Sequence, residues 1–168
     1  MSLRLEDIEL IRRLKYKYWR CMDTGDIAAL RELFVEDVKV DYVGGSYRWQ
    51  MQGREKILDS IAGSFNANAV ACHTGHHPEI DVLTDTTATG IWYLTDVFIN
   101  LAEKVRTTGS ALYRDKYLKT QGQWRIAESV YERVYEEVEP FEQPPKLTAH
   151  WLARVKPPHF TAAWNTRS

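Results

Sequence analysis

Apolar residues recur at helical spacing in the first part of the chain, where Arg and Lys occupy the intervening positions. The apolar positions of this segment are Leu5, Ile8, Ile11, Leu14, Tyr18 and Met22. The helix is expected to end near Asp23, because Gly25 supplies a C-cap. Asp26 is a suitable N-cap for a short second helix, whose apolar face is Leu30, Leu33 and Phe34.

Strand-like alternation appears first at Val38, Val40 and Tyr42. A Gly44-Gly45 turn leads into residues 47–51, and a third helix is predicted over 53–64. Later strands are predicted over 69–76, 79–83, 86–100, 107–120 and 124–137. Turn-forming sequences such as His77-Pro78 separate them.

This order of elements predicts an α+β fold: a cone-shaped, curved antiparallel β-sheet (a partial barrel) with three N-terminal helices packed over its concave face. Such a sheet encloses a cavity suited to a small apolar ligand. We expect one domain over 1–139, followed by a proline-rich extension over 140–168 that packs on the domain or on a neighbouring subunit. Within this extension a short helix is predicted over 147–155.

Asp96 is an anomaly in the middle of the strand predicted over 86–100. With a period of two, one face carries Ala88, Gly90, Trp92, Leu94, Asp96 and Phe98, and the other carries Thr89, Ile91, Tyr93, Thr95, Val97 and Ile99. Neither face is typical of a solvated one, and an ionised carboxylate in apolar surroundings is costly unless it is paired or hydrogen-bonded. A partner for Asp96 is therefore expected among the histidines, the tyrosines or another aspartate.

Composition narrows the class of protein. The chain has 168 residues and a formal net charge of -1, so nothing favours nucleic acid or an anionic membrane as a partner. Cys21 and Cys72 lack metal-type spacing, and no signal peptide or long apolar run is present, so two buried thiols in a cytoplasmic protein are expected. The six Trp and nine Tyr fit a large core, an apolar ligand pocket or an interface.

Two further polar residues stand out beside Asp96. Asp23 lies at the C-terminal end of the first predicted helix, where the helix dipole disfavours a negative charge, with a loop or helper-cap role as the alternative. His73 lies on a predicted strand among small residues and can point into a cavity, with a hydrogen-bonded core histidine as the alternative. His76 and His77 are expected to be structural or exposed, because the three histidines do not converge readily on one metal.

Proton transfer is the chemistry that remains. No nucleophile motif, phosphate loop or nucleotide fingerprint is present, so neither a cofactor nor a metal is expected. Tyr18 and Tyr42 face the core by pattern, and packing is their default role. A pocket-facing phenol can also donate to a substrate carbonyl.

The residues that carry this chemistry resemble a known pattern. The segments are Leu14 to Phe34, with Tyr18 and Asp23; His73-Thr-Gly-His76; and Ala88 to Asp96. Together they resemble the SnoaL-like branch of the nuclear-transport-factor-2-like superfamily over residues 4 to 139, and within it the bile acid 7α-dehydratases and, more distantly, the scytalone dehydratases.

The resemblance implies a role for five residues. It implies that His73 acts as general base, that Asp23 orients His73, that Asp96 is a second pocket acid, and that Tyr18 and Tyr42 hold the substrate oxygen. Substrate contacts are expected from Trp92, Leu94, Phe98, Tyr113 and Tyr131.

The function expected on these grounds is that of a cofactor-independent dehydratase, a carbon–oxygen lyase. Its substrate would be a small hydrophobic hydroxylated carbonyl compound such as a steroid or a polycyclic aromatic. A ketosteroid-type isomerase needs the same parts, and a non-catalytic ligand-binding or assembly domain of the same fold is the alternative from another class. The family likeness also implies a homo-oligomer, a trimer or a dimer, built through the outer face of the sheet.

Overall fold

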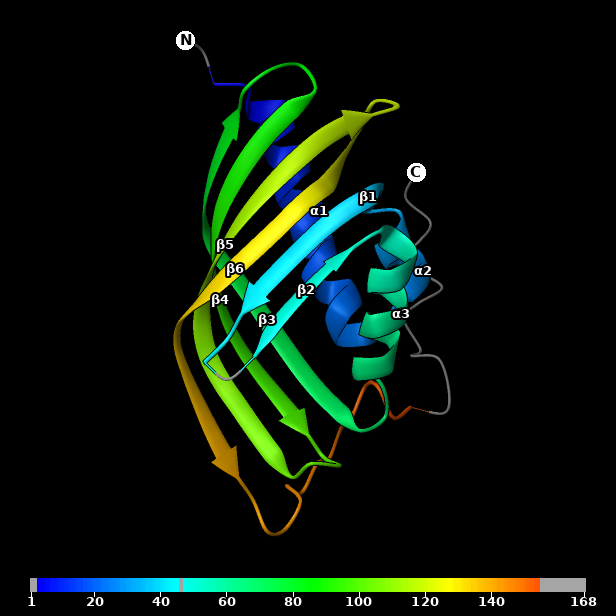
Figure 1. Ribbon diagram of the computed structural model, residues 1–168, viewed down its shortest axis with the longest axis vertical. Helices are drawn as coiled ribbons and strands as arrows, with labels where there is room; N and C mark the ends of the chain where they lie inside the picture. The colour runs from blue at the N-terminus through cyan, green and yellow to red at the C-terminus, as the bar shows by residue number, and fades with distance from the viewer. Residues whose placement is uncertain (1–2, 46, 155–168) are drawn as a thin grey trace.

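The computed structural model describes residues 3–45 and 47–154 (Figure 1). Three helices and six strands follow one another as α1 (Leu5–Thr24), α2 (Ile27–Arg31), β1 (Phe34–Val43), β2 (Arg48–Gln52), α3 (Arg54–Ser64), β3 (Ala69–Val82), β4 (Thr87–Asn100), β5 (Val105–Thr120) and β6 (Gln123–Pro140). This is the predicted order of helices and strands, except that the two strands predicted over 69–76 and 79–83 form the single strand β3.

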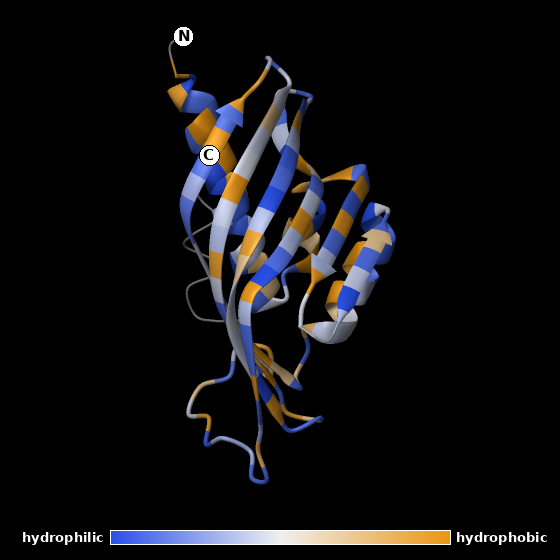
Figure 2. Ribbon diagram, turned by 60° about the vertical axis from the view of Figure 1, so that its left-hand side comes forward, coloured by the Kyte–Doolittle hydropathy of each residue, from blue (hydrophilic) through white to orange (hydrophobic). Residues whose placement is uncertain are grey.

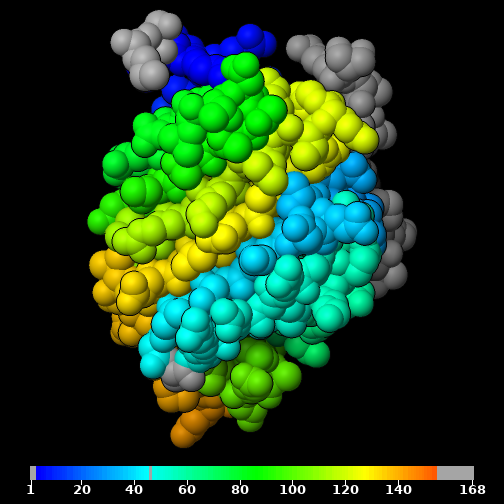
Figure 3. All heavy atoms as spheres, turned by 45° about the horizontal axis from the view of Figure 1, so that its top comes forward, coloured from blue at the N-terminus to red at the C-terminus, as the bar shows by residue number. Residues whose placement is uncertain are grey.

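The six strands form one curved sheet that does not close, in the order β2-β1-β6-β5-β4-β3. Figure 3 shows β6, β1 and β2 as neighbouring diagonal bands in yellow, blue and cyan. Neighbouring strands are antiparallel except β1 and β6, which run parallel, so the sheet is mixed rather than wholly antiparallel. The α+β class with a curved sheet and N-terminal helices is confirmed.

The ends of α1 and α2 follow the predicted capping chemistry. Gly25 adopts a left-handed conformation with φ of 66°, and its N–H bonds to the Met22 carbonyl at 3.2 Å. The Asp26 side chain accepts a hydrogen bond from the Ala29 N–H at 3.0 Å and so begins α2. These caps turn the chain sharply after Asp23, which holds that carboxylate against the sheet.

Alternation of apolar and polar positions along the strands separates the two faces of the sheet (Figure 2). On β4, Trp92 and Leu94 are buried against α1, whereas Ile91, Tyr93 and Val97 on the opposite face are 38%, 43% and 36% exposed. The expectation that neither face of β4 is solvated is therefore wrong for the single chain, because no described element covers the outer face.

A glycine allows α1 to lie close to β3. A Cβ atom on Gly75 would stand 1.9 Å from the Trp19 ring, so any other residue there would force the ring to shift. Trp19 in turn contacts the Trp92 ring edge-on, with the two centroids 5.4 Å apart. This close approach brings the C-terminal turn of α1 to the middle of β3.

Three local predictions are corrected. β3 runs unbroken through His77-Pro78, where the predicted break is instead a bulge with a register shift between His76 and Glu79 and a positive φ of 51° at His77. No helix forms over 147–154. That segment is held by side-chain contacts with the domain, since His150 Nε2 donates to the Ala69 carbonyl at 2.8 Å. Residues 155–168 of the predicted extension lie outside the described residues.

Cys72 is exposed, since it alternates with His73 along β3 and points to the outer face, whereas Cys21 is buried.

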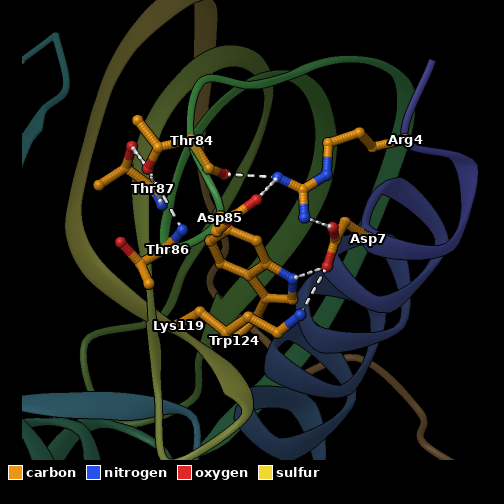
Figure 4. Close-up of polar contacts among 8 residues, drawn as sticks. All are labelled: Arg4, Asp7, Thr84, Asp85, Thr86, Thr87, Lys119 and Trp124. Carbon is orange, nitrogen blue, oxygen red and sulfur yellow. Dashed lines mark hydrogen bonds and ion pairs between the residues drawn. The ribbon is translucent and has the colours of Figure 1, made fainter. Parts of the chain in front are cut away.

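A polar cluster fastens the start of α1 to the end of the sheet (Figure 4). The Asp7 carboxylate accepts hydrogen bonds from Trp124 Nε1 at 2.8 Å and from Lys119 Nζ at 2.9 Å. Arg4 pairs with Asp7 at 2.7 Å and also reaches Asp85 at 2.8 Å in the turn between β3 and β4. Asp7 thus connects α1 with β5 and β6, and Arg4 connects this cluster with the turn between β3 and β4.

Replacing Asp7 by asparagine is expected to lower the free energy of unfolding by about 1–3 kcal/mol at neutral pH, since two hydrogen bonds to a charged acceptor are weakened. The bonds from Lys119 and Trp124 lower the pKa of Asp7 below its ordinary 3.8. A lowered carboxyl pKa means that this stabilisation is present above about pH 4 and is lost as the pH falls below it. Urea unfolding at neutral and acidic pH measures both effects.

The control is Asp85→Asn, because the Asp85 side chain is 94% exposed and its ion pair is worth little. Equal midpoints for wild type and Asp7→Asn at neutral pH would show that the cluster contributes nothing.

Candidate active site

Asp23 and His73 form a hydrogen-bonded pair where the end of α1 meets the middle of β3. His73 Nδ1 lies 2.5 Å from Asp23 Oδ1, and the backbone N–H of His73 donates to Asp23 Oδ2 at 2.9 Å. Both carboxylate oxygens are thus used by one residue, which fixes the imidazole ring relative to its own backbone. A carboxylate only accepts hydrogen bonds, so the proton lies on Nδ1, and Nε2 is the nitrogen left for a substrate.

The His73 side chain is 11% exposed and lines a cavity of about 240 Å³. The cavity lies between the helices and the concave face of the sheet. Its lining is mostly aromatic and consists of Tyr18, Met22, Tyr42, Tyr47, Trp49, Ser60, Ile61, Ser64, Phe65, His73, Tyr113 and Tyr131. Among the described residues, His73 supplies the only imidazole in this lining.

The aromatic lining has a simple origin in the register of the sheet. One row of directly opposed residues crosses five strands and reads Trp49, Tyr42, Tyr131, Tyr113 and Trp92 from β2 to β4. Within it the Tyr42 and Tyr131 rings stack with centroids 4.3 Å apart, and Tyr113 meets Tyr131 edge-on at 5.0 Å. The excess of Tyr and Trp in the sequence therefore serves both the core and the cavity wall.

Two tyrosine pairs carry hydroxyls at this wall. The Tyr18 and Tyr42 hydroxyls lie 2.9 Å apart, and the Tyr47 hydroxyl is hydrogen-bonded to that of Tyr131. Burial raises the pKa of Tyr18 and of Tyr42 well above the ordinary 10.0, so both phenols stay neutral at physiological pH.

The protein is expected to unfold at alkaline pH before its core phenols ionise. Burial raises the pKa of five tyrosines well above 10.0: Tyr18, Tyr42, Tyr113, Tyr117 and Tyr131. Since the folded state keeps protons that the unfolded state releases, this stability is complete below about pH 10 and is lost as the pH rises above it. Phenolate absorbance should therefore show fewer tyrosines titrating in the native protein than in urea, until both curves meet at unfolding. If the titration curves of the native protein and of the protein in urea superimpose, the prediction that the core phenols stay protonated in the folded state is wrong.

Asp96 is buried, as predicted, but its partner is an arginine. Arg133 Nη1 lies 2.5 Å from Asp96 Oδ1, and Nη2 lies 2.9 Å from Oδ2, a two-point ion pair. Asp96 stands directly opposite His73 in the β3–β4 register, yet its oxygens are held by Arg133 and not by His73, Asp23 or the tyrosines. Gly109, its neighbour on β5, leaves space for this bridge and for the β6 backbone, because a Cβ there would lie 3.2 Å from Arg133 Nη1 and 2.5 Å from the Tyr135 carbonyl oxygen.

The predicted substrate contacts fall into two groups. Tyr113 and Tyr131 line the cavity, as Tyr18, Tyr42 and His73 do. Trp92 and Leu94 are buried in the core, where Trp92 Nε1 donates to the Tyr117 hydroxyl at 2.9 Å. Phe98 packs against Phe65, which itself lines the cavity, with ring centroids 5.7 Å apart. For these three residues a contact with substrate remains a prediction.

Sequence reasoning missed Arg133 and several lining residues. Tyr47 and Trp49 are two positions apart in the segment 47–51 that follows the predicted turn, which is the signal that could have placed them on one face. Arg133 carries no such signal, since its reach across Gly109 depends on the pairing of β4, β5 and β6.

Within residues 3–45 and 47–154, no three His, Cys, Asp or Glu side chains gather in a position to hold a metal ion. No helix in the same ranges is long and apolar enough to cross a membrane.

The family model for the SnoaL-like domain matches residues 3–130, so the chain belongs to the SnoaL-like family. Among solved structures, a protein from Novosphingobium aromaticivorans assigned as a scytalone dehydratase is 22% identical, with a TM-score of 0.68 over 84% of this chain and 97% of that one. A hexachlorocyclohexane dehydrochlorinase, LinA-type3 from Novosphingobium barchaimii, is 15% identical, with a TM-score of 0.66 over 84% and 97%. At these identities the likeness shows a shared fold.

Proposed function

We propose that this protein is a cofactor-independent dehydratase that removes water from a hydrophobic hydroxylated carbonyl compound. The observation that carries the proposal is the Asp23–His73 pair in the wall of an aromatic cavity. An imidazole held by a carboxylate on Nδ1 presents Nε2 as a base, and histidine has an ordinary pKa suited to proton transfer near neutral pH. The solved relatives with lyase-type names support this class of reaction.

The proposed reaction starts at a carbon next to the substrate carbonyl. His73 Nε2 takes a proton from that carbon, and the electron pair of the broken C–H bond forms an enolate. The C–O bond at the neighbouring carbon then breaks as the enolate collapses to a conjugated carbonyl compound. The protonated imidazole returns its proton to the departing hydroxide, so that one water leaves and His73 is restored.

Asp23 stabilises the protonated imidazole and keeps its ring in place. Tyr18 and Tyr42 hold a substrate oxygen. For Asp96 we propose a supporting role and not that of a free acid, since both of its oxygens are already hydrogen-bonded to Arg133.

The cavity favours small substrates. Its volume of about 240 Å³ lies below the roughly 300–1,000 Å³ typical of sites for drug-sized ligands. Aromatic walls suit flat apolar rings, and no Lys, Arg, Asp or Glu is among the described lining residues to bind a charged compound. A one- or two-ring hydroxylated ketone therefore fits the proposal better than a full steroid.

The test is a panel of hydroxylated one- to three-ring ketones and 3-oxo steroids incubated with the purified protein and analysed by mass spectrometry. A dehydratase yields a product lighter by the mass of one water. An isomerase moves a double bond without a change of mass, which ultraviolet absorbance detects. If no compound changes at any protein concentration that saturates binding, the chain is a ligand-binding domain and the proposal is wrong.

Self-association through the outer face of the sheet is part of the proposal. Ile91, Tyr93 and Val97 give β4 a partly exposed apolar surface on that face, and surfaces of this kind mark contacts between proteins. Sedimentation velocity measures the oligomeric state of the wild type and of Tyr93→Glu. The wild type should be an oligomer and the variant a monomer, and a monomeric wild type would contradict the proposed self-association.

A further inference from the structure

A buried ion pair that the proposed reaction does not use lies behind the cavity. Lys15 Nζ of α1 stands 2.7 Å from Asp115 Oδ2 of β5, and both side chains are 0% exposed. The ammonium group also lies over the ring of Tyr113, 3.9 Å from its centroid, and 4.6 Å from that of Tyr18. Both of these rings line the cavity, so the pair is directly behind its wall.

Asp115 acts as an acceptor for two hydroxyls besides Lys15. Ser129, its direct neighbour on β6, donates from Oγ to Asp115 Oδ1 at 2.7 Å, and the Tyr117 hydroxyl donates to Oδ2 at 2.7 Å. The Trp92 indole is only a donor and gives its proton to the Tyr117 oxygen, so the Tyr117 proton is directed to Asp115. All of these partners are buried, and an ionised carboxylate in such surroundings accepts from every neighbour.

The same donor-to-acceptor order continues through the hydrogen bonds that connect Asp115 with the cavity wall. Ser129 has one proton and gives it to Asp115, so its oxygen accepts from the Tyr42 hydroxyl at 3.2 Å. Tyr42 has then used its own proton, so its oxygen accepts from the Tyr18 hydroxyl at 2.9 Å. The opposite order would place two oxygen lone pairs against each other in a buried site, which is unfavourable.

We propose that Ser129 and Asp115 are positioning residues that make the Tyr18–Tyr42 pair a hydrogen-bond acceptor for a ligand hydroxyl. Both protons of this pair are committed inside the protein, and only oxygen lone pairs remain for a ligand. Within the part of the chain that the structure describes, the Tyr47–Tyr131 pair has no such anchor: one of its two protons joins the phenols and the other is available to a ligand carbonyl. The cavity thus distinguishes the hydroxyl end of a ligand from its carbonyl end, an assignment that rests on the proposed function for the identity of the substrate.

The test uses binding and no catalysis. β-Naphthol and its methyl ether have the same ring system, but only the naphthol can donate a hydrogen bond. Isothermal titration calorimetry with the wild type should give a dissociation constant about tenfold lower for the naphthol, the effect of one hydrogen bond. In Ser129→Ala the Tyr42 proton can turn to Tyr18, which frees the Tyr18 proton for the ligand. The preference should then fall to about twofold or less.

Tyr42→Phe provides a second variant in case Ser129→Ala does not fold. It removes the acceptor of the Tyr18 proton, so the naphthol preference should fall in the same way. The control is Ser110→Ala, the same substitution on β5 at a serine that does not line the cavity, and it should keep the tenfold preference. A merely structural role of Ser129 would weaken both probes equally and leave their ratio unchanged.

Three outcomes overturn the inference: equal affinities in the wild type, an unchanged ratio in the variants, or no binding of either probe. Its failure is separate from that of the proposed function. A protein that eliminates water from a panel compound while it binds both probes equally would keep the reaction and lose the inference. A protein that shows the ratio and its change, but converts nothing, would keep the inference and lose the reaction.

Discussion

His73→Ala is expected to lower kcat/KM for water elimination about a thousand-fold, measured with the compound that the substrate panel identifies. General base catalysis by a positioned side chain contributes roughly 10²–10⁴-fold, and no other imidazole in residues 3–45 and 47–154 lines the cavity to replace this one. Asp23→Asn should lower kcat about a hundred-fold, because an amide no longer requires the proton on Nδ1 or stabilises the protonated ring. KM should change little in either variant, since the lining aromatic side chains are intact.

The control for both variants is His76→Ala. His76 lies on the same strand, where its Nε2 meets the Thr95 hydroxyl at 3.1 Å, and it does not line the cavity. Its activity should stay within about twofold of the wild type. Equal losses in His76→Ala and His73→Ala would mean that damage to β3 explains the effect and that His73 is no base.

The second large effect is on stability. Asp115→Leu is expected to lower the free energy of unfolding by about 4 kcal/mol, because it leaves the Lys15 ammonium buried without a counter-charge. Burial lowers the pKa of Lys15, and Asp115 opposes that shift in the wild type. In the variant the unfolded state therefore binds a proton more tightly than the folded state, so the stability of the variant should rise with pH up to about pH 10. Chemical unfolding at several pH values measures it.

The double variant Lys15→Met/Asp115→Leu is the matched control. Replacing both members of a buried pair by apolar residues removes the unpaired charge, so the double variant should recover more than half of the loss. A double variant as unstable as the single one, with no pH dependence in either, would show that the charge of Lys15 is not the cause.

The sequence was sufficient to predict local structure where one residue decides it. Gly25 and Asp26 end one helix and begin the next through their own backbone and side chain, and both were predicted. His77-Pro78 looked like a turn because its chemistry is that of a turn, yet β3 absorbs it as a bulge while pairing with β4 on both sides. Pairing over the whole strand outweighed the local preference.

In the candidate site, too, some features could be predicted from single residues and others depend on how the strands pair. Asp23 and His73 were predicted as partners from their unusual positions and from the family resemblance, and their side chains are hydrogen-bonded in the structure. Asp96 was identified as a buried charge in need of a partner, which is correct, but Arg133 is 37 residues away and reaches it only across the glycine of an intervening strand.

The network behind the tyrosines was not foreseen for a similar reason. Lys15 looks like one more basic residue on the polar side of an amphipathic helix, and Asp115 follows an arginine in an ordinary strand. Only the curvature of the sheet around α1 brings them together at 2.7 Å. Long-range pairing of this kind depends on register and curvature, which the periodicity of a single segment does not contain.

The most direct test of the central claim is a crystal structure of the protein with a bound unreactive analogue of the panel substrate. The account predicts that the analogue occupies the aromatic cavity with the carbon next to its carbonyl about 3–3.5 Å from His73 Nε2, the separation of reacting atoms in a productive complex. It also predicts that Asp23 still holds Nδ1. An analogue bound outside this cavity, or one that turns its reacting carbon away from His73, would contradict the claim that this histidine is the base.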